Sequence, residues 1–171
     1  MLSGAMGFAF QHWLTAKNTG SPASVDSALS TGDPLPSFVF SDLNGAPQSS
    51  DKWRGKIRVI NFWASWCPPC VRELPALERF AHRFDDQGVV VVAVAYDDVE
   101  NVLEFMSSTG IKLPVLHGDI EVYDLMRLLG NTSGALPFTV LADSQGVIID
   151  SIIGELEEEE LEPWVSPLLT N

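Results

Sequence analysis

The chain has 171 residues, 46% of them hydrophobic and 19% charged, so it is long and apolar enough to fold around one core and is not intrinsically disordered. Ten Lys and Arg residues face 23 Asp and Glu residues, and the formal net charge is -13. Because this charge repels phosphate backbones and anionic lipid surfaces, we expect no nucleic-acid partner.

The N-terminal segment has two parts of different composition. Residues 1–14 are mostly apolar, but they are fewer than the roughly 20 residues of a membrane-spanning helix and no basic residue precedes them. Residues 15–34 are rich in Ser, Thr, Gly and Pro, which is typical of a flexible linker. We interpret the two parts as the remnant of a signal anchor and its tether. The alternatives are an amphipathic N-terminal helix and a segment added during cloning.

The remaining residues, 35–171, carry the pattern of a single α/β domain. Residues 38–42 and 45–48 alternate as the strands of a hairpin do, with an Asn-Gly pair at the turn. The apolar, β-branched run over residues 56–63 predicts a strand that is buried on both faces.

A helix and a second strand follow this buried strand. From Pro69 onward, apolar residues recur at three- and four-residue spacing, which predicts a helix that ends near Gly88. Residues 89–96 predict another buried strand. The three elements make a βαβ unit, whose crossover should be right-handed.

The C-terminal half predicts three more helices and a second hairpin. Two helices are closed by Gly110 and Gly130, and two strands surround a turn at residues 143–146. The run 155–169 predicts a last helix. We interpret its glutamates as a solvated first turn that the helix dipole favours.

Cys67 and Cys70 are the only cysteines, and they lie where the first buried strand ends and its helix begins. Backbone N–H groups and the positive end of a helix stabilise a thiolate there, so Cys67 is the candidate nucleophile. Cys70, one turn along and more buried, would attack the Cys67 sulfur and resolve a mixed disulfide. Pro68 stiffens the connection, and Pro69 fits the first helical turn, where its missing N–H is not needed.

Two other interpretations of the cysteine pair are open. A structural zinc site needs four ligands, and beyond the pair the chain offers only three scattered histidines. Inert buried thiols would not be expected at a helix N-terminus with only two residues between them. Disulfide exchange is therefore favoured, with no metal and no cofactor beyond a redox-active Cys67–Cys70 disulfide.

The segment NFWASWCPPCVRELPALERF, residues 61–80, is followed about 70 residues after the cysteines by GALPFTVLADSQG, residues 134–146. Together these segments resemble the thioredoxin superfamily, and more narrowly the membrane-tethered TlpA-like thiol–disulfide oxidoreductases of the bacterial periplasm, which include reductants that serve cytochrome c maturation. The resemblance covers roughly residues 36–169. It implies a thioredoxin-like fold with an N-terminal β-hairpin and a central helix-and-strand insertion within residues 97–119.

The resemblance also implies roles for three residues near the pair. Leu136 and Pro137 would be joined by a cis peptide bond beside the cysteines, where the backbone of Leu136 can pair with an extended substrate segment; a trans bond at a strand start is the alternative. Glu73, one helical turn after Cys70, would tune the cysteines and relay a proton. A glutamate in a first helical turn is otherwise commonplace.

One position departs from thioredoxin itself, which has a buried aspartate where this chain has Asn61. An amide cannot exchange protons at neutral pH, so Glu73 becomes the substitute base. Trp66 adjoins Cys67 and is expected to form an apolar collar at which substrates dock, whereas Trp63 is expected to lie in the core. Plain packing is the alternative for both rings. With Trp66, we expect Pro68, Leu136 and Pro137 to contact the substrate.

We therefore predict a monomeric thiol–disulfide oxidoreductase of the periplasm, tethered to the inner membrane only through its N-terminal anchor. It would reduce disulfides of extracytoplasmic proteins with electrons from a membrane or periplasmic dithiol protein. An oxidant or isomerase shares every motif. A non-enzymatic docking module around Trp66 is the third possibility, whereas a peroxiredoxin-like peroxidase is disfavoured because the chain lacks a Pro-x-x-x-Thr-x-x-Cys segment.

Overall fold

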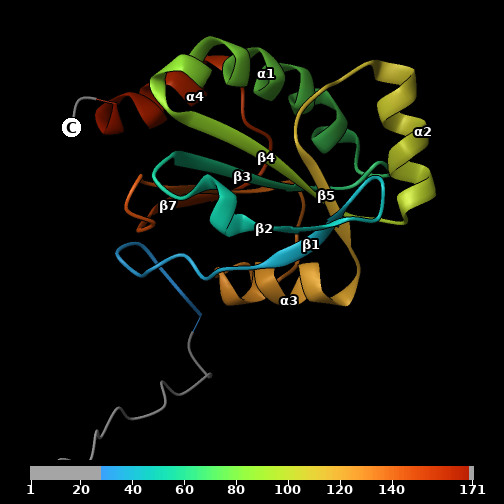
Figure 1. The fold of residues 1–171 in the computed structure, drawn as a ribbon, viewed down its shortest axis with the longest axis horizontal. Coiled ribbons are helices and arrows are strands. Elements are labelled where there is room, and N and C mark those ends of the chain that lie inside the picture. The colour runs from blue at the N-terminus through green and yellow to red at the C-terminus, as the bar shows by residue number, and fades with distance from the viewer. Residues whose placement is uncertain (1–27, 170–171) are drawn as a thin grey trace, which may run out of the picture.

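The structure is a computed structural model that describes residues 28–169, and its centre is a seven-stranded sheet in the order β2-β1-β5-β4-β3-β6-β7 (Figure 1). The strands are β1 (Val39–Asp42), β2 (Pro47–Ser49), β3 (Ile57–Trp63), β4 (Val89–Tyr96), β5 (Val115–Gly118), β6 (Phe138–Ala142) and β7 (Ile148–Ile153). The helices are α1 (Pro68–Phe84), α2 (Val99–Thr109), α3 (Ile120–Leu128) and α4 (Glu158–Val165). Three short 3-10 turns, η1 (Ser50–Trp53), η2 (Asp85–Gln87) and η3 (Ser166–Leu168), complete the described elements.

The centre of the sheet is the βαβ unit that the sequence predicts. All seven residues of β3 are buried, and β3 pairs in parallel with β4 and antiparallel with β6. The two hairpins, β1–β2 and β6–β7, are both antiparallel as expected. The predicted insertion is also present as α2 and β5, and β5 joins β4 to β1.

Side chains of β3 point alternately to the two faces of the sheet, and each face has its own core. Figure 1 shows α1 and α4 on one face of the sheet and α3 on the other. Val59 and Trp63 belong to the core cluster that includes α1 and α4 residues, and Ile60 and Phe62 belong to the cluster that includes α3 residues. The same alternation places Asn61 on the α1 face, because residues of equal parity share a face. A polar side chain therefore enters the core directly below α1.

Helix α1 lies across the sheet through an apolar stripe that includes Leu74, Leu77 and Phe80. The helix begins at Pro68, one residue before the predicted start, and Pro is suited to that first position. After η2, Gly88 adopts a left-handed φ of 79°, which allows the chain to turn sharply into β4.

The N-terminal boundary of the domain differs from the expected one. Residues 28–34 belong to the predicted linker, yet the Leu29 N–H donates to Leu128 O at 2.6 Å and the Gly32 N–H donates to Ile148 O at 2.8 Å. These bonds attach the end of the linker to α3 and β7, so the folded unit begins before residue 35. The predicted anchor and the rest of the linker lie outside the described residues. Between residues 28 and 169, no helix is long and apolar enough to cross a membrane.

The last helix forms where the glutamate-rich run predicts it. Glu157 and Glu160 make a reciprocal capping box at its start. Two other glutamates, however, are not simply solvated. Glu155 binds Arg72, and Glu158 binds Arg79, so one acidic residue just before α4 and one at its start connect this end of the chain to α1.

Candidate active site

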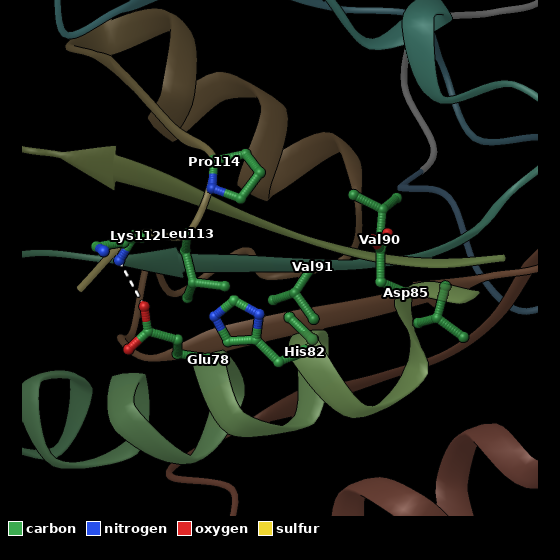
Figure 2. Close-up of a pocket in the computed structure, with 10 residues that line it drawn as sticks. Glu78, His82, Asp85, Val90, Val91, Lys112, Leu113 and Pro114 are labelled. Carbon is green, nitrogen blue, oxygen red and sulfur yellow. Dashed lines mark hydrogen bonds between the residues drawn. The ribbon is translucent and has the colours of Figure 1, made fainter. Parts of the chain in front are cut away.

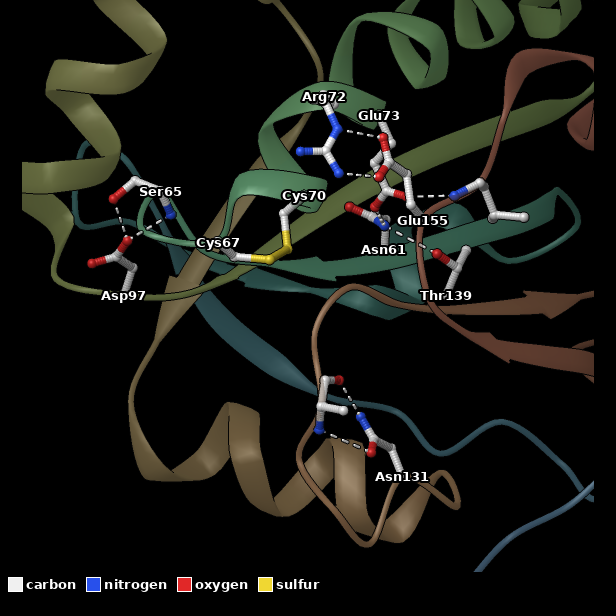
Figure 3. The surroundings of a disulfide bond; sticks show 12 residues. Asn61, Ser65, Cys67, Cys70, Arg72, Glu73, Asp97, Asn131, Thr139 and Glu155 are labelled. Atoms are coloured by element: carbon white, nitrogen blue, oxygen red, sulfur yellow. Dashed lines mark hydrogen bonds and ion pairs between the residues drawn. A yellow bond between two sulfur atoms is a disulfide. The ribbon is translucent and has the colours of Figure 1, made fainter.

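Cys67 and Cys70 form a disulfide at the junction of β3 and α1, with their Cα atoms 5.3 Å apart (Figure 3). Cys67 is the N-cap residue of α1, in an extended conformation, and Cys70 lies in the first turn. Cys70 is completely buried and Cys67 is slightly exposed, as the sequence predicts. A nucleophile at Cys67 and a resolving thiol at Cys70 are thus compatible with the geometry.

Glu73 follows Cys70 by one helical turn and is only 2% exposed. Its Oε1 accepts a 2.7 Å hydrogen bond from Asn61 Nδ2, and its Oε2 accepts a 2.9 Å bond from the Leu156 N–H (Figure 3). Burial raises the pKa of Glu73 to about 7, although both hydrogen bonds favour the charged form. Near neutral pH the carboxyl group can therefore both accept and release a proton.

Asn61 is fully buried and connects the helix to the sheet. Its Nδ2 donates both to Glu73 and to Thr139 Oγ1 on β6, the latter at 3.0 Å. Within the described chain, its Oδ1 has no hydrogen-bond partner. The sequence pattern indicated Asn61 only as a missing base, and it gave no signal for Thr139 or Leu156. An alternating polar residue in a buried strand could have indicated Asn61, but a backbone donor such as Leu156 has no sequence signature.

The Leu136–Pro137 peptide bond is cis, which confirms the expectation from the resemblance. The loop before it is held by the buried Asn131, whose Nδ2 donates to Ala135 O at 2.8 Å and whose Oδ1 accepts from the Ala135 N–H at 3.2 Å (Figure 3). In the described part of the chain, the backbone of Leu136 makes no hydrogen bond, so it is free to pair with another chain. No sequence pattern had indicated a role for Asn131.

Glycine is required at position 134 of this loop. Gly134 has a φ of +67°, and a Cβ atom there would lie 2.4 Å from the ring of Tyr123 on α3. Only glycine combines that backbone conformation with such close contact. The loop is therefore fixed both by side-chain hydrogen bonds and by packing on α3.

The two tryptophans have different surroundings. Trp63 is fully buried and packs against Phe105 of α2 with ring centroids 5.1 Å apart, which confirms its place in the core. Trp66 is 63% exposed next to Cys67, and Pro68 is also exposed. The loop that carries Trp66 is fixed by Asp97, whose Oδ2 accepts from the N–H and the hydroxyl of Ser65 at 2.8 and 2.6 Å (Figure 3).

A separate cavity of about 170 Å³ lies between the C-terminal half of α1, the start of β4 and residues 112–114, which precede β5 (Figure 2). Its wall includes Glu78 and His82, and the Glu78 carboxylate accepts a 2.6 Å bond from the Lys112 N–H. None of the predicted site residues lies there. Over residues 28–169, no group of three or more His, Cys, Asp or Glu side chains is arranged to hold a metal ion.

Comparison with known proteins agrees with this geometry. Residues 30–164 match the family described as Redoxin. The chain is similar to the thiol-disulfide oxidoreductase ResA of Bacillus thuringiensis (strain Al Hakam), with 29% identity over 170 residues that cover 98% of this chain and 91% of that protein.

Two solved structures are also similar. One is a thiol:disulfide interchange protein of the thioredoxin family from Chlorobium tepidum, with a TM-score of 0.72 and 28% identity over 83% of this chain and 99% of that one. The other is a secreted disulfide oxidoreductase of Mycobacterium tuberculosis, described as homologous to DsbE of E. coli, with a TM-score of 0.65 and 26% identity over 77% of this chain and 96% of that one. These similarities confirm the predicted thioredoxin-like fold.

Proposed function

The chain belongs to the Redoxin family, as a TlpA-like member of the thioredoxin superfamily, and from that premise we propose that it reduces disulfides of proteins outside the cytoplasm. It is a thiol–disulfide oxidoreductase, and the Cys67–Cys70 pair is its redox site. The observation that carries the proposal is the position of Cys67, at the N-terminus of α1 and next to the exposed Trp66.

In the reducing direction, the Cys67 thiolate attacks one sulfur of a substrate disulfide. A mixed disulfide forms, and the other substrate sulfur leaves as a thiolate that takes a proton from water. The Cys70 sulfur then attacks Cys67 Sγ, which closes the Cys67–Cys70 disulfide and releases the second substrate thiol. Two electrons pass to the substrate, and a dithiol protein must reduce the pair again.

Glu73 is the proton acceptor that we assign to the second step. Cys70 is fully buried, so its thiol proton cannot pass directly to bulk water. The carboxylate of Glu73 lies one turn further along α1 and can take that proton directly or through one water molecule. A pKa of about 7 suits a group that must accept a proton in one step and release it in the next.

The substrate surface that we propose combines three features around Cys67. Trp66 and Pro68, the two residues that flank Cys67 in the chain, are exposed. The backbone of Leu136, which makes no hydrogen bond within residues 28–169, would offer hydrogen bonds to an extended segment. Such a surface recognises main chain and general apolar character, so it would accept a range of protein disulfides.

The place of action is part of the proposal. The relative from Mycobacterium tuberculosis is described as secreted. The apolar residues 1–14 are consistent with an anchor that tethers the domain in the periplasm at the inner membrane. A membrane or periplasmic dithiol protein would supply electrons there, and we expect the domain to act as a monomer. Reduction of a disulfide in the cytochrome c maturation pathway is one activity that fits such a tethered reductant.

The test is the reduction potential of the Cys67–Cys70 pair, titrated in thiol–disulfide buffers and followed by tryptophan fluorescence, since Trp66 adjoins Cys67. A value near or below about -250 mV supports the reductant, whereas a value above about -180 mV would make the protein an oxidant or isomerase. The Cys67→Ser variant provides the second arm, because a docking module would not need this thiol. Full biological function of the variant would overturn the redox proposal in favour of a docking module.

A further inference from the structure

An ion pair lies directly beside the Glu73 site. Arg72 on α1 and Glu155, in the segment between β7 and α4, make two hydrogen bonds, from Nε to Oε1 at 2.9 Å and from Nη2 to Oε2 at 2.5 Å (Figure 3). Their chain neighbours are Glu73 and Leu156, which are themselves joined by the 2.9 Å bond from the Leu156 N–H. Two consecutive residues of α1 thus hold two consecutive residues of the segment.

We propose that Arg72 and Glu155 are positioning residues for Glu73, because their two-bond ion pair holds the Leu156 N–H against the buried carboxylate. The inference rests on the proposed function in that Glu73 is the proton acceptor of the second step. The pair itself touches neither cysteine. It acts on the reaction through the one backbone donor that Glu73 receives from this segment.

The geometry separates this role from simple attachment of the segment. The Leu156 side chain is buried in the core cluster that includes Leu74 and Leu77 of α1, so it fixes the segment without the ion pair. Removing the pair therefore leaves the fold intact and frees mainly the orientation of the 155–156 backbone. A bidentate Arg–carboxylate pair is well suited to fix such an orientation.

The groups around Glu73 make the direction of the effect predictable. Strand β3 presents the amide of Asn61, and the connecting segment presents the Leu156 N–H; neither titrates. The charged groups are Glu155 and Arg72, together with the Cys67–Cys70 pair when it is reduced. Loss of the N–H bond removes a donor that favours the carboxylate, so Glu73 would remain protonated to higher pH.

A direct electrostatic effect would have a different signature. The negative charge of Glu155 opposes ionisation of Glu73, so on charge alone Glu155→Gln would lower the pH at which Glu73 is half protonated. Loss of the ion pair would raise that pH. Arg72→Gln would raise the pH of half protonation of Glu73 whether positioning or charge dominates, because it removes a positive charge as well as the ion pair. The sign of the shift in Glu155→Gln therefore distinguishes positioning from charge.

The experiment is a pH titration of the oxidised protein, labelled with ¹³C at the glutamate carboxyl carbons and followed by NMR. The Glu73 signal is identified by its absence in Glu73→Gln. We expect Arg72→Gln to move the midpoint upward by about one pH unit, as for loss of one hydrogen bond to a carboxylate. Glu155→Gln should also move it upward, but by less, because loss of the Glu155 charge acts in the opposite direction. The charge-exchanged double variant Arg72→Glu/Glu155→Arg should restore the wild-type midpoint.

Arg79→Gln is the matched control. Arg79 is 60% exposed, against 61% for Arg72, and it also joins α1 to the α4 end through a glutamate, Glu158. It should leave the midpoint unmoved. The proposal is overturned if Glu155→Gln lowers the midpoint or leaves it unchanged, or if Arg79→Gln moves it as far as Arg72→Gln does. Because the oxidised protein is titrated, these outcomes do not depend on whether it is a reductant.

Discussion

The amide of Asn61 on β3 donates a 2.7 Å hydrogen bond to the carboxylate of Glu73 on α1, and both side chains are buried. The bond links the strand that ends at the cysteines to the helix that carries them. It also gives the carboxylate one of the two donors that partly offset its burial. The protonation of Glu73 is thus coupled to the packing of α1 on the sheet.

Glu73 should make the stability of the oxidised protein depend on pH. Its pKa is raised from 4.5 to about 7 in the folded state, so between these values the folded protein holds a proton that the unfolded chain releases. The free energy of unfolding therefore falls as the pH rises. Relative to Glu73→Gln, the wild type should lose ~2.5 kcal/mol between pH 5 and pH 8. Urea unfolding at both pH values measures the difference; parallel behaviour of the two proteins would contradict the assigned environment.

Asn61→Asp should destabilise the oxidised protein, most strongly at high pH. The variant places a second buried carboxyl group in hydrogen-bonding range of Glu73, and two such groups cannot both ionise cheaply. We expect a loss of ~3 kcal/mol at pH 8 and clearly less at pH 6, where the pair can share a proton. Thermal and urea unfolding at the two pH values test this expectation. Asn61→Ser, which adds no charge, is the control for the lost amide and should show no comparable pH dependence.

Much of the fold could be predicted because its signals are local. The apolar run before Cys67 specifies β3, the three- and four-residue spacing after it specifies α1, and Gly110 closes α2 as expected. The thioredoxin-like fold, with its N-terminal hairpin and central insertion, was implied by the resemblance. Composition does not reveal that the N–H of Leu29, within the predicted linker, donates to the carbonyl of Leu128 at the end of α3.

The candidate site could be predicted only where residue types carry the chemistry. The cysteines and Glu73 have such types, and the structure brings them together at the start of α1. Asn131 and Asp97 act instead by fixing loops, through bonds to Ala135 and Ser65 that depend on the tertiary arrangement. A buried asparagine and an aspartate at a strand end are common in sequences, and neither pattern alone indicates these contacts.

Asn131→Ala should loosen the loop that carries the cis proline. The variant removes two hydrogen bonds to Ala135 from a fully buried side chain, so we expect the free energy of unfolding to fall by ~2 kcal/mol. Reduction of a protein disulfide should slow several-fold because the Leu136 backbone is no longer held in place. Reaction with a small aromatic disulfide, which needs no strand pairing, should be nearly unchanged. Equal loss for both substrates would argue against a docking role for this loop.

Trp66→Ala should affect substrates more than stability. The side chain is 63% exposed, so unfolding free energy should change by less than about 0.5 kcal/mol. If the ring contacts substrate proteins, kcat/KM for a protein disulfide should fall roughly tenfold, the size expected for loss of an aromatic anchor. Stopped-flow rates with a protein and with a small disulfide measure the two effects. Leu103 is also apolar and exposed, but it lies on α2, so Leu103→Ala provides the control and should change neither rate.

Cys70→Ser should trap a covalent complex with a substrate protein. In the proposed sequence, Cys67 attacks first and Cys70 releases the mixed disulfide, so removing Cys70 leaves the intermediate without its resolving thiol. The reduced variant, mixed with a disulfide-containing protein, should form a covalent complex whose mass in non-reducing mass spectrometry is the sum of the two proteins. Dithiothreitol should cleave the mixed disulfide and separate them. Cys67→Ser should trap far less, since its remaining thiol is fully buried. If Cys67→Ser were instead the variant that trapped substrate, the roles of the two cysteines would be reversed, and the slight exposure of Cys67 would not identify the attacking sulfur.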